Sequence, residues 1–453
     1  MLKTPNDMNI KKIINTVICG NALTELKKIP NNCIDTIITS TPYWGLRNYH
    51  TEPQIWDEDE NCQHEWNDNL VVKRSGGGNS GKISHNTICH FENISNFCSK
   101  CGAWKGSLGL ELNFDSFLSH LYQIFDECKR ILKKTGSCWV VLSDTYAGSG
   151  NGSWNAPIEQ RGKQYRKTCN IDQEYLAPPI RNNTLPDKCL CLIPQRFAIG
   201  MCERGWTLRN DIIWEKPNSL PSSVVDRFSV NYEHIFFFVK NKKYYFEQQF
   251  EPLQVSTLLR AKYNSYSEKT DMGLSGGMDL EGQKKIFKKM LDPNYPGRNM
   301  RAIWNVSTQS FSDNHYAVFP QKLVKNMILA GCPEFVCAKC NKPRTKVIER
   351  QGLSSADYPS NKDKSTYLSE QGQKQNLRGP REAYKRQIVD KGYISCNCGV
   401  EFEPGICLDP FMGAGTTGLV ARKLNRNFIG IELSQSYTDM AEKRLKNELG
   451  LFY

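Results

Sequence analysis

The stretch that most constrains the fold is Cys407-Leu-Asp-Pro-Phe-Met-Gly-Ala-Gly-Thr-Thr417, close to the end of the 453-residue sequence. An apolar run from Gly405 to Leu408 precedes it, and an apolar, helix-like segment from Thr417 to Leu424 follows. A second short apolar run, Phe428 to Ile431, comes next. Strand, glycine turn, helix and strand in this order predict part of a doubly wound α/β sheet that binds a ligand at the carboxyl ends of its strands.

The residues of the turn indicate which ligand fits. Gly413 and Gly415 let the backbone come close to a bound molecule, and the following helix offers free N–H groups. Glu432 ends the next strand, where an acid can accept both ribose hydroxyls of a nucleoside. No Gly-Lys-Ser/Thr ending follows the turn, so a phosphate-gripping loop is not indicated. The pattern favours a nucleoside without phosphates.

A second stretch, near the other end of the chain, makes this interpretation specific. Asp35-Thr-Ile-Ile-Thr-Ser-Thr-Pro-Tyr-Trp44 is an apolar strand that opens into Ser40-Thr41-Pro42-Tyr43. Together the two stretches resemble the S-adenosylmethionine-dependent DNA amino-methyltransferases. The signatures of that family are Asp-Pro-Phe-x-Gly-x-Gly-Thr-Thr for the cofactor and (Ser/Asp/Asn)-Pro-Pro-Tyr for catalysis. A dinucleotide-binding protein with a chance Pro-Tyr is the alternative, and it needs two independent coincidences.

The resemblance implies a Rossmann-like methyltransferase sheet in circularly permuted order. The catalytic motif comes first and the cofactor motif last, as in the β group of the family. It also implies contacts with S-adenosylmethionine: Asn21 near the adenine, Glu432 on the ribose, and the glycine turn near the methionine moiety. His315 to Pro320 resembles the motif that packs against the methionine end, although Tyr316 stands where proline is usual. The expected cofactor-binding residues are Asn21, Asp409, Phe411, Gly413, Gly415, Thr416, Glu432 and Phe319.

The catalytic loop, Ser40, Thr41, Pro42 and Tyr43, predicts methyl transfer to the exocyclic amine of a DNA base. Such an amine is a poor nucleophile, and the Ser40 hydroxyl and the Thr41 main-chain carbonyl can accept hydrogen bonds from its two N–H groups and free its lone pair. Tyr43 offers an aromatic face to a flipped base, and Trp44 either helps or only packs. The Pro-Cys motif of enzymes that methylate a ring carbon is not seen.

The identity of the base is a separate question. In the resembled family, serine at the first catalytic position goes mostly with cytosine N4, which is therefore the expected target. Adenine N6 is the alternative, and methylation of RNA or of a protein amine is a further one. A zinc-containing DNA-binding protein with an inactive methyltransferase fold is the rival from another class. Thr41, where the family usually has proline, is the feature in its favour.

Cysteines predict two structural zinc sites. The chain has 18 cysteines, and in an intracellular protein these suggest metal ligands and buried thiols rather than disulfides. Two close pairs form each expected site. His85, Cys89 and His90 are alternative ligands for the first site, and Cys332 is one for the second. The expected ligands are Cys62, His64, Cys98 and Cys101 in the first site, and Cys337, Cys340, Cys396 and Cys398 in the second.

Composition and rhythm suggest how the chain is divided. The net charge of +12 suits a polyanionic partner, so DNA is expected, and a separate restriction endonuclease is a candidate second partner. No run of about eighteen apolar residues occurs, which predicts a soluble, cytoplasmic, DNA-associated protein. The expected parts are a catalytic half (13–60 and 107–246), a Cys/His insert (61–106), a target-recognition region (247–302), a cofactor half (303–335 and 403–449) and a zinc-ribbon-like insert (336–402).

Regular elements are expected in the catalytic half. Asp115 is the predicted cap of a helix that Gly136 ends, and a buried strand follows at Cys138 to Leu142. A helix from Cys191 to Arg204 then precedes strands at Leu208 to Glu215 and His234 to Lys240. Basic residues of the recognition region are expected to contact DNA, with a plain solvated surface as the alternative: Arg260, Lys262, Lys284, Lys285, Lys288, Lys289, Arg298 and Arg301.

Overall fold

A computed structural model describes residues 9–45, 51–66, 70–71, 92–93, 96–147, 185–219, 222–266, 286–292, 295, 297–309, 320–351, 387–394 and 396–450. The chain forms two compact units. The first comprises residues 1–246, 302–332 and 405–453, and the second comprises 247–301 and 333–404. The second unit is thus built from two insertions in the first.

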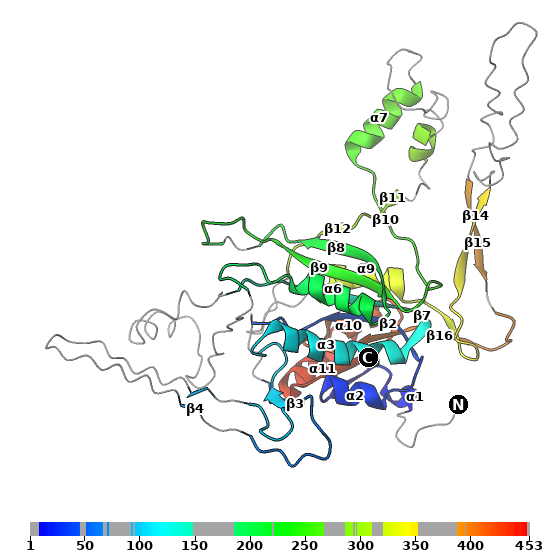
Figure 1. Ribbon diagram of the computed structural model, residues 1–453. Helices are drawn as coiled ribbons and strands as arrows, with labels where there is room; N and C mark the ends of the chain where they lie inside the picture. The colour runs from blue at the N-terminus through cyan, green and yellow to red at the C-terminus, as the bar shows by residue number, and fades with distance from the viewer. Residues whose placement is uncertain are drawn as a thin grey trace, which may run out of the picture. The chain divides into compact units, whose positions relative to one another are not determined.

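An eight-stranded sheet forms the centre of the first unit (Figure 1). All neighbouring strands run parallel except β9, which is antiparallel to both β7 and β8. The strands, in their order across the sheet, are β1 (Thr16–Cys19), β18 (Asn427–Glu432), β17 (Ile406–Asp409), β2 (Ile34–Ser40), β7 (Leu132–Leu142), β9 (Tyr232–Val239), β8 (Thr207–Glu215) and β12 (Ile303–Asn305).

At one edge of this sheet, two strands from the C-terminal part of the chain lie between two strands from the N-terminal part. β18 lies between β1 and β17, and β17 lies between β18 and β2. In the β17–β2 pair, Leu408 is opposite Ile37. Because these strands are parallel, the loops that follow β2 and β17 leave the sheet at the same edge. Two motifs separated by most of the sequence therefore emerge side by side.

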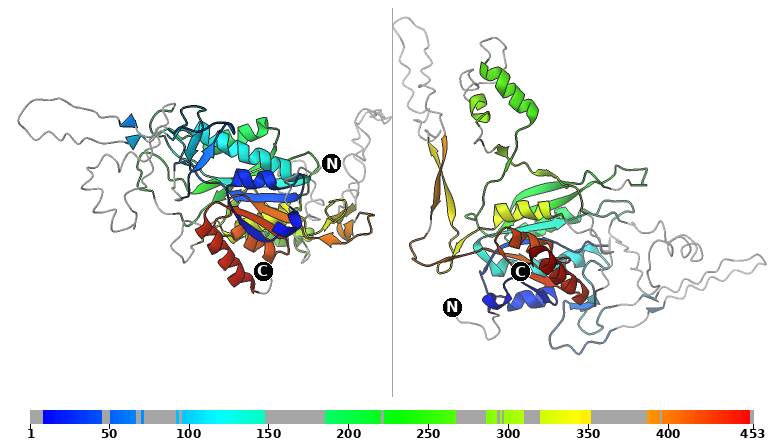
Figure 2. Two further views of the ribbon diagram at one scale, coloured as in Figure 1. Left: turned by 90° about the horizontal axis from the view of Figure 1, so that it is seen from below. Right: turned by 180° about the vertical axis from the view of Figure 1, so that it is seen from behind.

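Helices cover both faces of the sheet, so the expected doubly wound arrangement is confirmed (Figure 2). On one face lie α2 (Ala22–Lys28), α3 (Phe114–Ile131) and α6 (Ile193–Glu203); on the other lie α9 (Gln321–Gly331), α10 (Thr416–Lys423) and α11 (Gln435–Leu449). A short helix, α1 (Ile10–Ile13), precedes β1.

Alternate residues of β7 serve the two faces, as the pleat of a strand requires. Cys138 and Val140 belong to the core under α3. Ser137 and Trp139 point to the other face, where α9 ends at Gly331. A Cβ atom on Gly331 would lie 2.5 Å from Ser137 Oγ and 2.6 Å from Trp139 Nε1, so only glycine allows α9 to lie this close.

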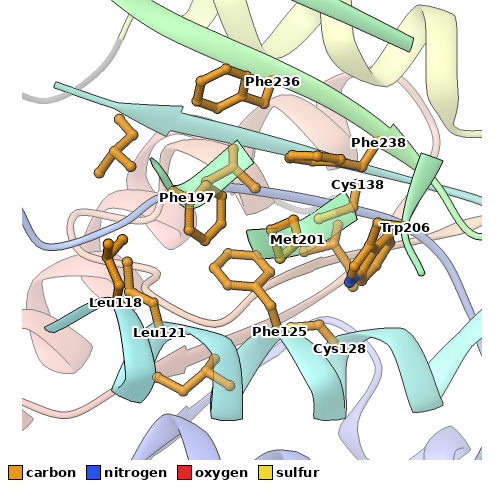
Figure 3. Close-up of a cluster of buried hydrophobic side chains, with 14 of the residues drawn as sticks. Leu118, Leu121, Phe125, Cys128, Cys138, Phe197, Met201, Trp206, Phe236 and Phe238 are labelled. Atoms are coloured by element: carbon orange, nitrogen blue, oxygen red, sulfur yellow. The ribbon is translucent and has the colours of Figure 1, made fainter. Parts of the chain in front are cut away.

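The larger core fills the space between α3, α6 and the sheet (Figure 3). α3 presents a fully buried stripe that includes Leu121 and Phe125, and α6 contributes Phe197. Phe236 and Phe238 of β9 meet this stripe from the sheet. Burial of each such side chain contributes roughly 1.5–3 kcal/mol, which fixes the helices against the strands that carry the functional loops.

Two details of the predicted helix in this region were wrong. The N-cap of α3 is Asn113, whose side chain accepts a hydrogen bond from the Ser116 N–H at 2.8 Å, and Asp115 lies in the first turn. The helix ends at Ile131, and Gly136 lies within β7. The Gly136 backbone lies close to β2, because a Cβ atom on Gly136 would lie 2.9 Å from the Asp35 carbonyl oxygen. The glycine permits strand packing and does not end a helix.

Small antiparallel pairs make up much of the remaining described structure. In the first unit, β3 (Gln54–Trp56) pairs with β6 (Trp104–Gly106), and β4 (Leu70–Val71) with β5 (Glu92–Asn93). The second unit contains helix α7 (Val255–Tyr266) and the pairs β10 (Phe250–Glu251) with β11 (Arg298–Asn299), β13 (Val336–Cys337) with β16 (Phe402–Glu403), and β14 (Thr345–Gln351) with β15 (Gln387–Ile394). None of the helices in these described ranges has the length and apolarity that a membrane crossing requires.

Candidate active site and cysteine clusters

A hydrogen bond joins the two motifs that the sequence singled out. The Thr39 hydroxyl at the end of β2 donates to Asp409 Oδ1 at the end of β17, at 2.6 Å. Asp409 also accepts from the Thr417 hydroxyl at 2.6 Å and from the Phe411 N–H at 3.0 Å. Complete burial raises the pKa of Asp409 to about 6, while these hydrogen bonds lower it. Asp409 therefore ties β2, the glycine turn and α10 together.

The two glycines of the turn differ in what surrounds them. Both have positive φ, +50° at Gly413 and +77° at Gly415, which favours glycine at each position. A Cβ on Gly415 would lie 3.0 Å from Ala441 Cβ, so this glycine packs against α11. A Cβ on Gly413 would meet only the Phe411 carbonyl oxygen, at 4.0 Å. Gly413 therefore borders open space, as a turn that lies against a ligand requires.

Glu432 closes the turn from the neighbouring strand. Its Oε2 accepts from the Gly413 N–H at 2.8 Å and its Oε1 from the Ser434 N–H at 3.0 Å. Burial raises the pKa of Glu432, and the backbone N–H groups counteract that rise. The Leu433 N–H also interacts with this carboxylate, which has about four lone-pair sites, so at least one site is left for a further donor.

Two other expected cofactor residues have structural partners. The Asn21 side chain caps α2 by accepting from the Thr24 N–H at 3.1 Å, and its amide donates to Gln54. The buried Thr416 hydroxyl accepts from Arg444 of α11 at 3.0 Å. Both residues lie at the edge of the sheet from which the glycine turn leaves. The hydrogen bonds of Asn21 and Thr416 within the protein account for both side chains without a ligand. Phe319 lies outside the described residues.

The catalytic loop directly follows β2. Ser40 Oγ lies 3.3 Å from the Tyr43 phenol oxygen, and that phenol donates to Glu233 Oε2 at 2.7 Å. Lys216, at the end of β8, donates to the other oxygen of the Glu233 carboxylate. The chain of polar contacts from Ser40 through Tyr43 to Glu233 and Lys216 fixes the loop to the first residues of β9. Neither Glu233 nor Lys216 was predicted from the sequence, because an acid beside a strand and a lysine before proline carry no distinctive pattern.

Thr41 and Trp44 are buried within this loop. The Thr41 side chain is only 2% exposed, and its hydroxyl has no hydrogen-bond partner among the described residues. The Trp44 indole donates to the Glu111 carbonyl oxygen at 2.9 Å and packs edge-on against Phe114. Trp44 therefore belongs to the core, so the alternative in which it only packs is the one that these contacts support.

A second polar cluster, around Glu111, packs against the catalytic loop. The buried Glu111 carboxylate accepts from the Gly109 N–H at 2.7 Å and lies 2.9 Å from His120 Nδ1. His120 is stacked between Trp56 and Trp104. Gly109 has φ +95°, and a Cβ there would lie 3.1 Å from the Tyr43 carbonyl oxygen. Burial raises the pKa of Glu111. The segment that contains Gly109 and Glu111, which follows Cys101, thus packs against the catalytic loop.

Comparison with known proteins identifies the family of this arrangement. The sequence model of the DNA methylase family that covers N6 and N4 enzymes matches residues 34–335 and 397–443, which include both motifs. The chain belongs to this DNA methylase family. It is accordingly an S-adenosylmethionine-dependent DNA amino-methyltransferase.

Relatives of this methylase match it over nearly its whole length. It is 27% identical over 433 residues to the type II methyltransferase M.Cfr9I of Citrobacter freundii, which covers 96% of this chain and 88% of the relative. It is 24% identical over 432 residues to M.SmaI of Serratia marcescens, covering 95% and 90%. Among solved structures, the cytosine-N4-specific PvuII DNA methyltransferase aligns with a TM-score of 0.42 at 11% identity, covering 98% of this chain and 96% of that one.

The methylase brings the first predicted set of metal ligands together. The ligand atoms of Cys62, His64, Cys98 and Cys101 all lie within 4.8 Å of one another. The Cys62 and Cys98 sulfurs are 3.8 Å apart. Tetrahedral zinc with bonds of about 2.3 Å separates its sulfur ligands by about 3.8 Å, whereas a disulfide bond is about 2.05 Å long. The alternative ligands His85, Cys89 and His90 lie outside the described residues.

The second predicted set also converges, within the second unit. The sulfurs of Cys337, Cys340, Cys396 and Cys398 lie within 4.8 Å of one another. The Cys340 N–H points to Cys337 Sγ at 3.5 Å and is the main cause that lowers the pKa of Cys337 to about 6. Cys332, the alternative ligand, is fully buried in the first unit beside Cys407. Four cysteines therefore form this cluster without it.

Some of the basic side chains expected to contact DNA in the recognition region already form ion pairs within the protein. Arg298 and Arg301 both pair with Glu251, at 2.6 and 2.7 Å. Arg260 and Lys288 are exposed, whereas Lys284 and Lys285 lie outside the described residues. The two paired arginines hold the β10–β11 pair together, which weakens the expectation that they contact phosphates.

Proposed function

We propose that this methylase transfers a methyl group from S-adenosylmethionine to the exocyclic N4 amine of cytosine at a specific site in duplex DNA. The hydrogen bond between Thr39 and Asp409 carries this proposal, because it holds the loop that bears Ser40 against the glycine turn. The choice of cytosine rests on Ser40, since serine at this position goes mostly with cytosine N4 in the resembled family. Adenine N6 methylation with the same residues is the alternative.

The cofactor side of the site is assigned from donors, acceptors and free space. When bound, S-adenosylmethionine supplies an activated methyl group on its sulfonium sulfur. The remaining lone pairs of Glu432 suit the ribose hydroxyls, and the open space at Gly413 suits close contact with the backbone. Asp409 and Thr416 support the turn through their own partners. The role of Asn21 near the adenine remains a proposal, because its side chain caps α2.

On the base side, the chain supplies acceptors and an aromatic face. The Ser40 hydroxyl and the Thr41 carbonyl accept hydrogen bonds from the two N–H groups of the amine, which turns the nitrogen toward sp³ geometry and frees its lone pair for in-line attack. Tyr43 stacks against the base, and Glu233 fixes the Tyr43 ring through the phenol oxygen. No base is needed before transfer, since the amine proton leaves afterwards. The target must leave the duplex to reach these groups.

Zinc in both cysteine clusters is part of the proposal. Four soft ligands within 4.8 Å of one another in each cluster match a closed, structural zinc site with no open position for a substrate. The first site would join the segment before β4, with Cys62 and His64, to the segment of Cys98 and Cys101, which leads to the residues that pack against the catalytic loop. The second would hold the base of the β14–β15 hairpin in the second unit.

Biological context follows from the relatives. Those at 24–27% identity are named type II methyltransferases, so a partner restriction endonuclease in the same cell is proposed. The net charge of +12 suits DNA as the substrate. A DNA-associated protein of the cytoplasm fits this role.

Product analysis tests the function. The protein is incubated with unmethylated genomic DNA and methyl-labelled S-adenosylmethionine, and the digested nucleosides are identified by mass spectrometry. Labelled N4-methylcytosine is the expected product, whereas labelled N6-methyladenine would keep the mechanism and overturn the base. The Tyr43→Ala variant serves as the control for label from contaminating enzymes. Cofactor binding without any labelled nucleoside would favour RNA or protein substrates, and loss of cofactor binding altogether would favour an inactive DNA-binding fold.

A further inference from the structure

The loop between β8 and β9 carries the most exposed apolar side chains in the described part of the chain. Val225 is 99% exposed and Phe228 is 97% exposed. Val224 and Val230 of the same loop and Tyr232, the first residue of β9, are exposed as well. A single exposed apolar residue is ordinary, but a cluster of this kind marks a binding surface.

The two residues between Val225 and Phe228 are anchored to the protein. The Asp226 carboxylate accepts from Lys188 Nζ at 2.7 Å. The Arg227 guanidinium carbon lies 3.6 Å from the centroid of the Tyr146 ring, over its face. These contacts hold the middle of the loop against the segments that follow β7 and precede α6. Val225 and Phe228 are therefore presented outward by an anchored turn.

The loop rises beside the catalytic loop. It enters β9 at Tyr232, and the next residue is Glu233, the hydrogen-bond partner of Tyr43. Glu233 lies five positions after Phe228, a distance of at most roughly 17 Å along a fully extended chain. That span is less than the diameter of a DNA duplex. A duplex whose base reaches Tyr43 can therefore contact Val225 and Phe228 with its adjoining base pairs.

We propose that Val225 and Phe228 form an apolar wedge that enters the target duplex next to the flipped base. The inference rests on the proposed function, because it requires a base that leaves a duplex. Side chains inserted between base steps replace the stacking that extrusion removes, at a cost of a few kcal/mol per step. Duplex DNA is the favoured occupant because the loop belongs to the reactive edge of a DNA methylase and contains Arg227, and because Lys188 lies against Asp226 of the loop.

Substrates that differ only in pairing test the wedge. The variant Val225→Ala/Phe228→Ala is compared with the wild type on a matched duplex and on the same duplex with a mismatch opposite the target base. On the matched duplex we expect kcat/KM to fall roughly tenfold or more, because burial of two apolar side chains is lost. On the mismatched duplex we expect the variant to stay within about threefold of the wild type, because an unpaired base is extruded more easily.

Matched controls separate the wedge from general damage. Ile199→Ala removes another exposed apolar side chain, on α6, and should leave both rates unchanged. An equal loss on both duplexes, or no loss on the matched duplex, overturns the wedge. A wild-type dimer in sedimentation that the double variant loses would also overturn it, because the patch would then join two copies of the chain.

A binding readout separates this inference from the proposed function. With 2-aminopurine paired to thymine at the target position, extrusion raises fluorescence although this base has no N4 amine to methylate. We expect the wild type to raise the signal severalfold and the double variant to leave it near that of free DNA. A full fluorescence rise with the double variant contradicts the wedge. Extrusion of 2-aminopurine by the wild type, together with no methylated product from the matched cytosine duplex, contradicts the proposed function alone.

Discussion

The phenol oxygen of Tyr43 donates a 2.7 Å hydrogen bond to Oε2 of Glu233. Glu233 is the second residue of β9, and its other carboxylate oxygen is held by Lys216 from the end of β8. The aromatic ring that is proposed to receive the base is therefore fixed by side chains from β9 and from the residue after β8, two neighbouring antiparallel strands. A loop of four residues gains its orientation from side chains nearly two hundred positions away.

Tyr43→Phe tests whether this anchor matters for the rate. The ring remains, but a hydrogen bond to a charged acceptor, worth about 1.5–3 kcal/mol, is lost, and we expect kcat to fall roughly tenfold. The affinity for S-adenosylmethionine should not change. Tyr43→Ala should lower kcat roughly tenfold further, because a stacked base is worth about 1–3 kcal/mol.

Tyr122→Phe is the matched control for this prediction. It removes a phenol hydrogen bond to the Arg196 carbonyl oxygen, which joins α3 to α6. Stability should decrease while kcat stays the same. Equal kcat values for the Phe and Ala variants of Tyr43 would show that the ring contributes nothing beyond its hydroxyl, and full activity of the Ala variant would remove the stacking role.

How far the sequence predicts this protein depends on the range of the interactions. The strands, most helix bounds and the eight residues of the two cysteine clusters follow from local patterns: apolar runs, glycine turns and short cysteine spacings. The convergence of Ser40 with Gly413 follows only from the resemblance, because nothing local states that β2 pairs with β17. Sequence patterns also place Asn21 and Thr416 at the correct edge of the sheet. They do not reveal that Thr24 and Arg444 already occupy these side chains.

The residues that sequence patterns missed share one property. Glu233, Lys216, Glu111 and His120 act through specific polar partners that only the fold reveals, whether distant, as for Glu233 with Tyr43, or near in sequence, as for Glu111 with Gly109 and His120. An isolated acid or histidine has no periodicity that distinguishes a loop support from a solvated surface residue. Asp115 and Gly136 failed for the opposite reason: local rules for caps and helix ends were satisfied, but Asn113 and the approach of the Asp35 carbonyl decided the actual structure.

Glu432→Gln tests the assignment of the ribose acceptor. The amide group of glutamine would place its NH₂ against either the Gly413 or the Ser434 N–H, both of which now donate to the carboxylate. We expect the affinity for S-adenosylmethionine to fall at least roughly tenfold, since a buried donor is left unpaired. Calorimetric titration measures this directly. Asp439→Asn, on exposed α11 surface, is the control and should bind normally; unchanged affinity of the Gln variant would remove Glu432 from the site.

Asp409 should make stability depend on pH. Its pKa is about 6 in the folded protein and 3.8 in the absence of burial, so the folded state holds a proton that the unfolded state has released. The contribution of this carboxyl to stability is full below pH 3.8 and is lost as the pH rises through 6. The stability difference between the wild type and Asp409→Asn should fall by about 1 kcal/mol from pH 5 to pH 7.5. Urea midpoints measured across this range check the slope, and a rise would contradict the assignment.

Each cysteine cluster should hold its own zinc ion. We expect two zinc ions per purified wild-type chain by elemental analysis, and one after either Cys98→Ser or Cys337→Ser, because a tetrahedral site loses most of its affinity with one ligand. Cys202→Ser changes an exposed cysteine outside both clusters and should retain two. A single zinc ion in the wild type that survives one of the two cluster variants would restrict the metal to the other cluster.

Thr41→Val tests which atom of Thr41 serves the base. The hydroxyl is buried without a partner among the described residues, and such a group costs about 1–3 kcal/mol, so the valine variant should be at least as stable as the wild type. The proposed acceptor is the main-chain carbonyl, which the substitution keeps, so kcat should change less than about threefold. Thermal denaturation and single-turnover rates measure the two effects. A stable variant with a large loss of kcat would transfer the role to the hydroxyl, because the fold would be intact while the only removed group was the buried oxygen. That outcome would also explain why threonine replaces the usual proline at this position.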